Sequence, residues 1–148
     1  MAVACRPVRV PEFMSEAYHY ARPSAFSRGM EVRLAGARMV FVSGTASVGA
    51  EGESLHIGDF QAQAWRAFEN ARAVLRASGA DWRDVVKTTI YLRDIDRDYA
   101  ALNEVRIAYF REVGIEDYPA STCVEARLCR PELLVEMDMI AVVEQSSF

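Results

Sequence analysis

The residue types best suited to chemistry lie near the C-terminal end of the chain. Between positions 120 and 128 polar side chains alternate with apolar ones, and the polar set is Ser121, Cys123, Glu125 and Arg127. Such alternation is typical of a half-buried strand, which turns every second side chain to the same side. The next strand-like segment carries Glu136 between apolar neighbours. We predict that Glu136 joins the set on one surface, which lines a small-molecule pocket.

Glu136 is the predicted catalytic residue. A carboxylate with apolar neighbours on a strand loses hydration, which raises its pKa and makes it a proton donor near neutral pH. The alternative is a structural carboxylate that accepts hydrogen bonds from backbone amides. We favour catalysis because of a family resemblance given below.

Six residues are predicted to bind substrate, namely Ser43, Gly44, Asn103, Ser121, Cys123 and Arg127. Ser43 and Gly44 end a strand, where backbone amides can hold an anion or only form a turn. Ser121 either orients a water or substrate oxygen or enlarges the pocket. Cys123 is a pocket wall or a packed thiol, since no histidine is predictably near enough to make it a nucleophile. Asn103 is a pocket donor or a structural residue near the start of a helix.

The elements that must position these residues follow the order β-β-α-β-α-β-β. Strands are expected at 31–34, 39–43, 85–92, 120–128 and 133–143, and helices at 59–78 and from Asp96 to about 113. Two helices on one face of a single mixed sheet make an α+β fold. The second face would then expose apolar strand residues, so we expect oligomerisation.

Residues 1–27 are predicted to be irregular because prolines interrupt regular structure there. Residues 28–148 are predicted to form a single domain.

Composition narrows the possible partners. The formal net charge of −4 provides no basic face for nucleic acid, so no nucleic-acid partner is expected. There is no run of about 18 apolar residues, and the N-terminus does not read as a secretory signal, so no membrane association is expected. Three widely spaced cysteines fit a reducing cytoplasm. No metal is expected, since no residues have zinc-ligand spacing.

Over roughly residues 28–143 the chain resembles the RidA/YjgF superfamily. The matching segments are 40–44, 63–70, 84–92, 103–110, 119–125 and 134–141. The resemblance implies a chorismate-mutase-like fold and a homotrimer with pockets between subunits. It also implies cofactor-free hydrolysis of reactive enamines or imines to keto acids and ammonia. Glu136 matches the glutamate that positions water or donates a proton in that family.

The chain departs from the family motif at one position. In the RidA/YjgF superfamily an arginine follows Pro-Ala, and its planar guanidinium group binds both oxygens of the substrate carboxylate. In this chain Ser121 follows Pro119 and Ala120, and it has neither the charge nor the reach. If the substrate is an acid, another cation must hold it. The candidates are Arg22, Arg28, Arg106 and Arg127.

A second, local resemblance is to the RidA-like half of chorismatases, which hydrolyse or rearrange chorismate. It is carried by residues 43–47, 54–63 and 129–136. Together the two resemblances suggest a divergent hydrolase or lyase acting on a small unsaturated or imine- or enamine-containing acid. The alternatives are a standard 2-iminoacid or enamine deaminase and a non-catalytic trimer that binds a small ligand.

Overall fold

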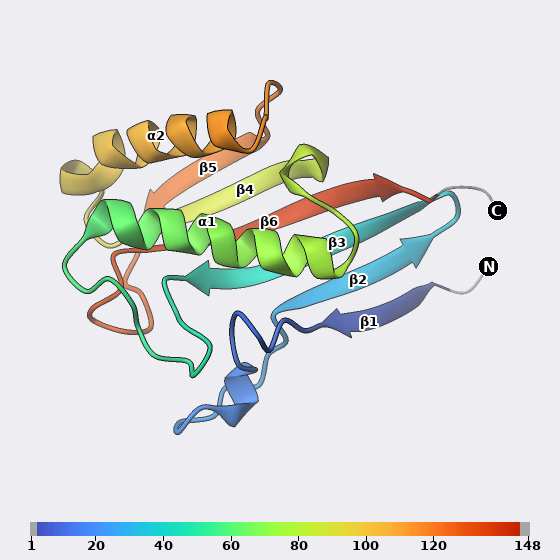
Figure 1. The fold of residues 1–148 in the computed structure, drawn as a ribbon, viewed down its shortest axis with the longest axis horizontal. Coiled ribbons are helices and arrows are strands. Elements are labelled where there is room, and N and C mark those ends of the chain that lie inside the picture. The colour runs from blue at the N-terminus through green and yellow to red at the C-terminus, as the bar shows by residue number, and fades with distance from the viewer. Residues whose placement is uncertain (1–2, 146–148) are drawn as a thin grey trace.

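The computed structural model describes residues 3–145 and contains one sheet and two long helices (Figure 1). The strands are β1 (Ala4–Val8), β2 (Gly29–Leu34), β3 (Ala37–Ala46), β4 (Val85–Leu92), β5 (Ala120–Glu125) and β6 (Val135–Glu144). The helices are α1 (Phe60–Ala77) and α2 (Ile95–Glu112), with single 3-10 turns η1 (Ala17–His19) and η2 (Trp82–Asp84). From β2 onward this is the predicted order. No helix in the described range is long and apolar enough to cross a membrane.

The sheet runs in the order β1-β2-β3-β6-β4-β5. Only β4 and β5 pair in parallel among the described strands, which makes the sheet mixed as predicted. Both helices cover the same face (Figure 1). The core lies between them and the sheet, where Phe68 packs against Trp82, Tyr109 and Phe110.

Helix α1 begins and ends at residues that satisfy its free backbone groups. The Asp59 carboxylate accepts a hydrogen bond from the Ala62 amide at 3.0 Å. Ser78 closes the helix, and Gly79 follows with a φ of +67°, which a side chain would strain. Its buried stripe includes Ala64, Phe68 and Leu75, which recur at helical spacing.

Helix α2 is capped two residues before Asp96, where the sequence predicted its start. The capping residue is Asp94, whose carboxylate accepts a hydrogen bond from the Arg97 amide at 3.0 Å. The Glu125 carboxylate, at the end of β5, accepts a second one from the Ile95 amide at 3.1 Å. Asp94 is the cap because its carboxylate reaches the Arg97 amide and its carbonyl accepts from the Asp98 amide, whereas Asp96 lies inside the helix.

The prediction that residues 1–27 are irregular was wrong for residues 4–8, which form strand β1. This strand pairs with β2 alone and lies at the sheet edge. Pro7 lacks a backbone donor, and an edge strand is where that lack is tolerated. Residues 1–2 of the predicted segment, and 146–148 of the predicted domain, lie outside the described residues.

The predicted strand at 120–128 is shorter because its only neighbour ends first. β5 pairs with β4, and the last bond runs from the Ala126 amide to the Leu92 carbonyl at 2.9 Å. Beyond Leu92, β4 offers nothing to pair with, so the chain leaves the sheet and forms a loop up to β6.

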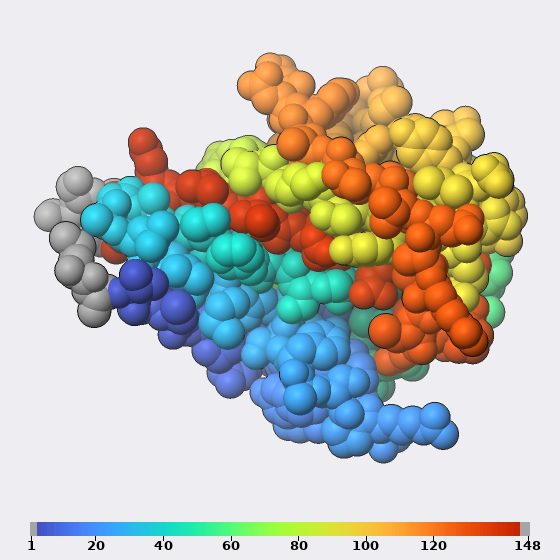
Figure 2. Space-filling model, turned by 180° about the vertical axis from the view of Figure 1, so that it is seen from behind, coloured from blue at the N-terminus to red at the C-terminus, as the bar shows by residue number. Residues whose placement is uncertain are grey.

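No described element covers the second face of the sheet, which Figure 2 shows with the N-terminal segment below it. Met30, Phe41 and Ile140 lie side by side across β2, β3 and β6 on this face. Large apolar side chains there are substantially exposed, including Met30, Phe41, Val86, Val124 and Val142. A patch of this kind is typical of an interaction surface.

One buried carboxylate ties the N-terminal strands together. Glu31 on β2 is fully buried and pairs with Arg6 of β1 at 3.0 Å, Arg33 of β2 at 2.9 Å and Arg38 of β3 at 3.2 Å. Arg38 also donates to the carbonyl of Ser78 at the end of α1. Hydrogen bonds from Arg6, above all, and from Arg33 lower the pKa of Glu31 to about 2 despite its burial.

We predict that Glu31→Gln lowers the free energy of unfolding by about 2–3 kcal/mol at pH 7. Because the folded-state pKa lies below the ordinary value of 4.5, the stabilisation is present above that pH and is lost as the pH falls toward 2. Urea unfolding of both proteins at several pH values measures this. Exposed Glu116→Gln is the control, and a stability difference that does not shrink in acid would contradict the prediction.

Candidate functional site

Two pockets contain predicted site residues. The larger, of about 660 Å³, is here called the arginine pocket. It is lined by residues of the N-terminal segment 20–28, the end of β3, loop residues 51–53, loop residues 129–133 and Glu136. The smaller, of about 300 Å³, is called the α2 pocket and lies between α2 and β5. Its lining includes Asn103, Arg106 and Ser121.

Glu136 is half-buried in the arginine pocket, on the face of the sheet that the helices leave uncovered. On β6 it lies opposite Tyr91 of β4 and Ala46 of β3. Its carboxylate accepts no hydrogen bond from residues 3–145 that would mark it as structural. Burial raises the pKa of Glu136, and the negative charge of Asp138 raises it further. The group is thus suited to hold a proton nearer neutral pH than an ordinary carboxyl.

Gly44 provides the space that this carboxylate occupies. A Cβ atom at position 44 would lie 2.2 Å from Oε1 of Glu136, far inside van der Waals contact. The pairing of β3 with β6 is interrupted between Val42 and Thr45, so Gly44 lies in a bulge. A glycine in this bulge therefore lets the sheet carry a large acidic side chain into the pocket.

Asp138 does not compete with Glu136 for the pocket. Its carboxylate accepts a hydrogen bond from the Tyr91 hydroxyl at 2.8 Å, and it lies outside the pocket lining. The pair raises the pKa of the Tyr91 hydroxyl. Asp138 therefore acts on Glu136 through its charge.

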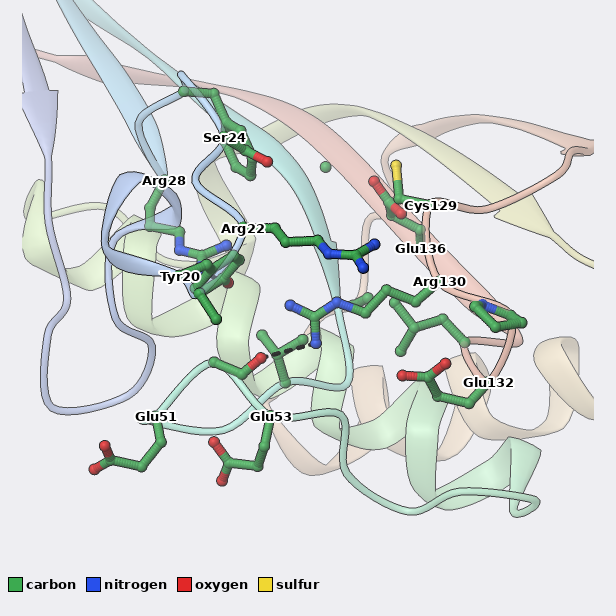
Figure 3. Close-up of a pocket in the computed structure, with 18 residues that line it drawn as sticks. Tyr20, Arg22, Ser24, Arg28, Glu51, Glu53, Cys129, Arg130, Glu132 and Glu136 are labelled. Carbon is green, nitrogen blue, oxygen red and sulfur yellow. Dashed lines mark hydrogen bonds between the residues drawn. The ribbon is translucent and has the colours of Figure 1, made fainter.

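Three arginines contribute to the wall of the arginine pocket (Figure 3). Arg22 and Arg28 come from the N-terminal segment, and Arg130 comes from the loop between β5 and β6. Arg28 is buried, donates to the Ser15 carbonyl at 2.6 Å and to the Tyr20 hydroxyl, and thereby fixes the segment. Arg130 donates to the Gly52 carbonyl at 2.8 Å.

The loop that carries Arg130 is held by side chains from the core. Buried Gln63 of α1 donates to the Glu132 carbonyl at 3.0 Å and accepts from the Leu134 amide at 2.9 Å. Arg93, after β4, donates to the Arg130 carbonyl at 2.6 Å. With its backbone bonded on both sides, the loop presents Arg130 in a defined direction.

The α2 pocket brings Asn103 and Ser121 together through a shared partner. Arg106 donates to the Ser121 hydroxyl at 3.1 Å and to the Asn103 side-chain oxygen. A guanidinium from α2 thus lies against Ser121 on β5. Neither Asn103 nor Ser121 lines the arginine pocket.

The prediction that Glu136 shares a surface with Ser121 and Cys123 was wrong. β4 lies between β5 and β6, and it pairs Thr88 with Ser121 and Ile90 with Cys123. Thr88 and Ile90 point into the core beneath the helices, whereas Tyr91, opposite Glu136, points to the other face. Alternation predicts which side chains of one strand share a face, but it cannot show how two strands align across a third.

The remaining predicted residues lie outside both pockets. The Ser43 hydroxyl donates to the Ser27 carbonyl at 2.5 Å, and its amide donates to the Arg28 carbonyl, so it holds the N-terminal segment. Cys123 packs against the core, and burial raises the pKa of its thiol, which disfavours a thiolate. Arg127 is exposed beyond the end of β5. Their roles in substrate binding stay predictions.

Sequence reasoning missed Arg130, Tyr20 and Gln63 as site residues. Gln63 left a signal, since it is a polar residue one turn before Ala67 on the buried side of a helix. Arg130 and Tyr20 left none, because their meeting depends on how two loops fold over the sheet.

Within residues 3–145, no group of three or more acidic, histidine or cysteine residues could hold a metal ion.

Known proteins resemble this chain along most of its length. The profile of the endoribonuclease L-PSP family matches residues 21–143. A RutC family protein of Pyrococcus abyssi is 38% identical over 71% of this chain and 79% of its own length. The 3-aminoacrylate deaminase RutC of Acinetobacter baylyi is 34% identical over the same shares. The crystal structure of E. coli TdcF with bound serine superposes with a TM-score of 0.76 at 28% identity, covering 94% of this chain and 99% of TdcF.

We predict that Gly44→Ala displaces the Glu136 carboxylate, since the new methyl group would occupy its place. The free energy of unfolding should fall by about 1 kcal/mol, at the low end for overpacking, because the carboxylate ends a flexible side chain. In the double variant with Glu136→Asp, the shorter side chain should restore at least about 0.5 kcal/mol. Urea unfolding of the four proteins measures this coupling, and additive losses would contradict the predicted contact.

Proposed function

The chain belongs to the endoribonuclease L-PSP family, the RidA/YjgF superfamily, and from this premise we propose that it is a small-molecule hydrolase or lyase. Its substrate would be a small unsaturated or imine- or enamine-containing acid. The observation that carries the proposal is Glu136, a half-buried carboxyl group with a raised pKa that faces a pocket lined by arginines. Proton donors with such properties concentrate at active sites.

In the proposed reaction Glu136 handles the proton and a water molecule supplies the oxygen. A protonated Glu136 gives its proton to the unsaturated carbon of an enamine, which becomes a protonated imine, and Glu136 is left as a carboxylate. Water then adds to the imine carbon, the amine leaves as ammonia, and a keto acid remains. Glu136 regains a proton from the attacking water.

Two features support a substrate other than that of a standard deaminase. Ser121 provides no cation on the strand, and the cations in the pocket of Glu136 come from loops instead. The name of the A. baylyi relative supports 3-aminoacrylate, a three-carbon acid, as the compound that tests the alternative of a standard deaminase. A ribonuclease activity, as in the family's name, fits poorly with a net charge of −4.

We also propose that the protein works as a homotrimer with shared pockets. Ser121 and Asn103 lie on the side of the sheet opposite Glu136, so these residues can act on one substrate only if different subunits provide them. The exposed apolar face of the sheet supports such an assembly, because a second copy would remove it from water.

We predict that Glu136→Gln lowers turnover by about 10²–10⁴-fold. The wild-type rate should fall as the pH rises above the raised pKa of Glu136, since the protonated form is the donor. Ammonia release and keto-acid formation from 2-iminoacids generated in situ measure this, with exposed Glu112→Gln as the control. Unchanged turnover in Glu136→Gln would refute the catalytic role, and the absence of ammonia at any pH would exclude the deaminase.

We predict that Val142→Glu yields monomers in sedimentation experiments, whereas the wild type sediments as a trimer. Val142 is 40% exposed on the uncovered face, so the change should spare the fold but place a charge in the interface. Ile57→Glu, at a 70% exposed loop residue, is the matched control and should leave the trimer intact. A wild-type monomer would refute the shared pockets.

A further inference from the structure

The charges of the arginine pocket are arranged without ion pairs. Its lining contains four glutamates, which are Glu51, Glu53, Glu132 and Glu136. In the described part of the chain, none of these carboxylates forms a salt bridge with Arg22, Arg28 or Arg130. Among residues 3–145, six arginines outside the pocket pair with carboxylates. Arg28 is occupied by the Ser15 carbonyl and the Tyr20 hydroxyl, which leaves Arg22 and Arg130 with donor groups that a ligand can use.

Arg130 is held in place by neutral groups. Its Nη1 donates to the Gly52 carbonyl at 2.8 Å and to the Ser54 hydroxyl at 3.0 Å, and the guanidinium lies over the Tyr20 ring, 5.2 Å from the centroid. Gly52 is required there, since a Cβ atom would lie 2.4 Å from a carbon of the Tyr20 ring. Nε and Nη2 of Arg130 donate to no residue in the range 3–145.

Arg22 approaches from the opposite wall. In Figure 3 its side chain extends from the N-terminal segment into the pocket, and the Arg130 side chain extends toward it from the other side. Arg22 donates to no residue within the described range. The backbone that carries it is fixed by buried Arg28, whose Nε and Nη2 both donate to the Ser15 carbonyl.

Building on the proposed function, we infer that Arg22 and Arg130 hold the carboxylate of the substrate in the arginine pocket, within the cavity that Glu136 faces. Two guanidinium forks with free donors match the paired oxygens of a carboxylate. Glu136 and Cys129 lie on the same side as the Arg130 loop in Figure 3, so the reacting part of the ligand would lie against them. The acid is thus recognised by two loops, with no cation from β5.

The size of the pocket narrows the ligand class further. Within one subunit the pocket has a volume of about 660 Å³, which is in the range of pockets that enclose drug-sized ligands and exceeds what a three-carbon acid fills. Tyr20, Phe26 and Leu133 contribute apolar wall. We infer an acid with a ring-sized apolar body.

Calorimetric titration with three probes tests both parts of the inference. The probes are 3-phenylpropanoate, its neutral amide and propanoate, so that charge and size change separately. We expect 3-phenylpropanoate to bind with a Kd of about 1 mM or tighter, and each of the others at least about 10-fold more weakly. Arg22→Gln should weaken the binding of 3-phenylpropanoate by at least about 10-fold, and exposed Arg83→Gln should leave it unchanged.

Arg130→Lys is a second variant, with thermal unfolding as its check, because Arg130 also bonds to two loop residues. It should weaken the binding of 3-phenylpropanoate and leave the binding of its amide unchanged. The inference would be overturned if 3-phenylpropanoate bound no more tightly than its amide or than propanoate. It would also be overturned if neither acid bound, or if Arg22→Gln bound 3-phenylpropanoate as tightly as the wild type.

Glu136→Gln separates this inference from the proposed function. It should keep the binding of 3-phenylpropanoate while losing turnover. Binding that depends on Arg22 in a protein that turns over no unsaturated acid would refute the proposed function and leave the inference standing.

Discussion

The hydrogen-bond register of β4 with its two neighbours determines what this protein can place in one pocket. Each side chain of β4 shares its face with the residues opposite it on β5 and β6, so Tyr91 aligns Glu136 with Val124. On β5, Ser121 and Cys123 then point beneath the helices, and the Ser121 hydroxyl accepts a hydrogen bond from Arg106, which also bonds Asn103. The acidic group and the residues of the α2 pocket are thereby kept on opposite sides of one sheet within a single subunit.

The chain uses its arginines in two different ways. Around Glu31, three of them share one buried carboxylate, which joins β1, β2 and β3. In the arginine pocket, guanidinium groups are fixed by carbonyls, a hydroxyl and the face of a tyrosine ring. The first arrangement neutralises charge inside the protein, whereas the second retains charge that can attract an anion.

The parts of the fold that local spacing controls could be predicted from the sequence. Strand β4 has its predicted bounds and α1 nearly so, because their periodicity is decided by burial on one side. Strand β1 depends on its pairing with β2, which the positions of the prolines do not reveal. The cap depends on the distance from the Asp94 carboxylate to the Arg97 amide, which residue types alone do not reveal. For the site, Glu136 and Gly44 were each named from the sequence for separate reasons and line one pocket, but Arg130 and Tyr20 meet only through the folding of two loops.

Gln63 and Arg93 hold the loop before β6 by its main chain, through the carbonyls of Glu132 and Arg130 and the amide of Leu134. Backbone groups are the same whatever side chain a position carries. Replacing Cys129, Arg130 or Glu132 would therefore change the lining of the pocket and leave these three bonds in place. Ligand preference in this protein can diverge by substitutions in the loop, at little cost to the scaffold that presents it.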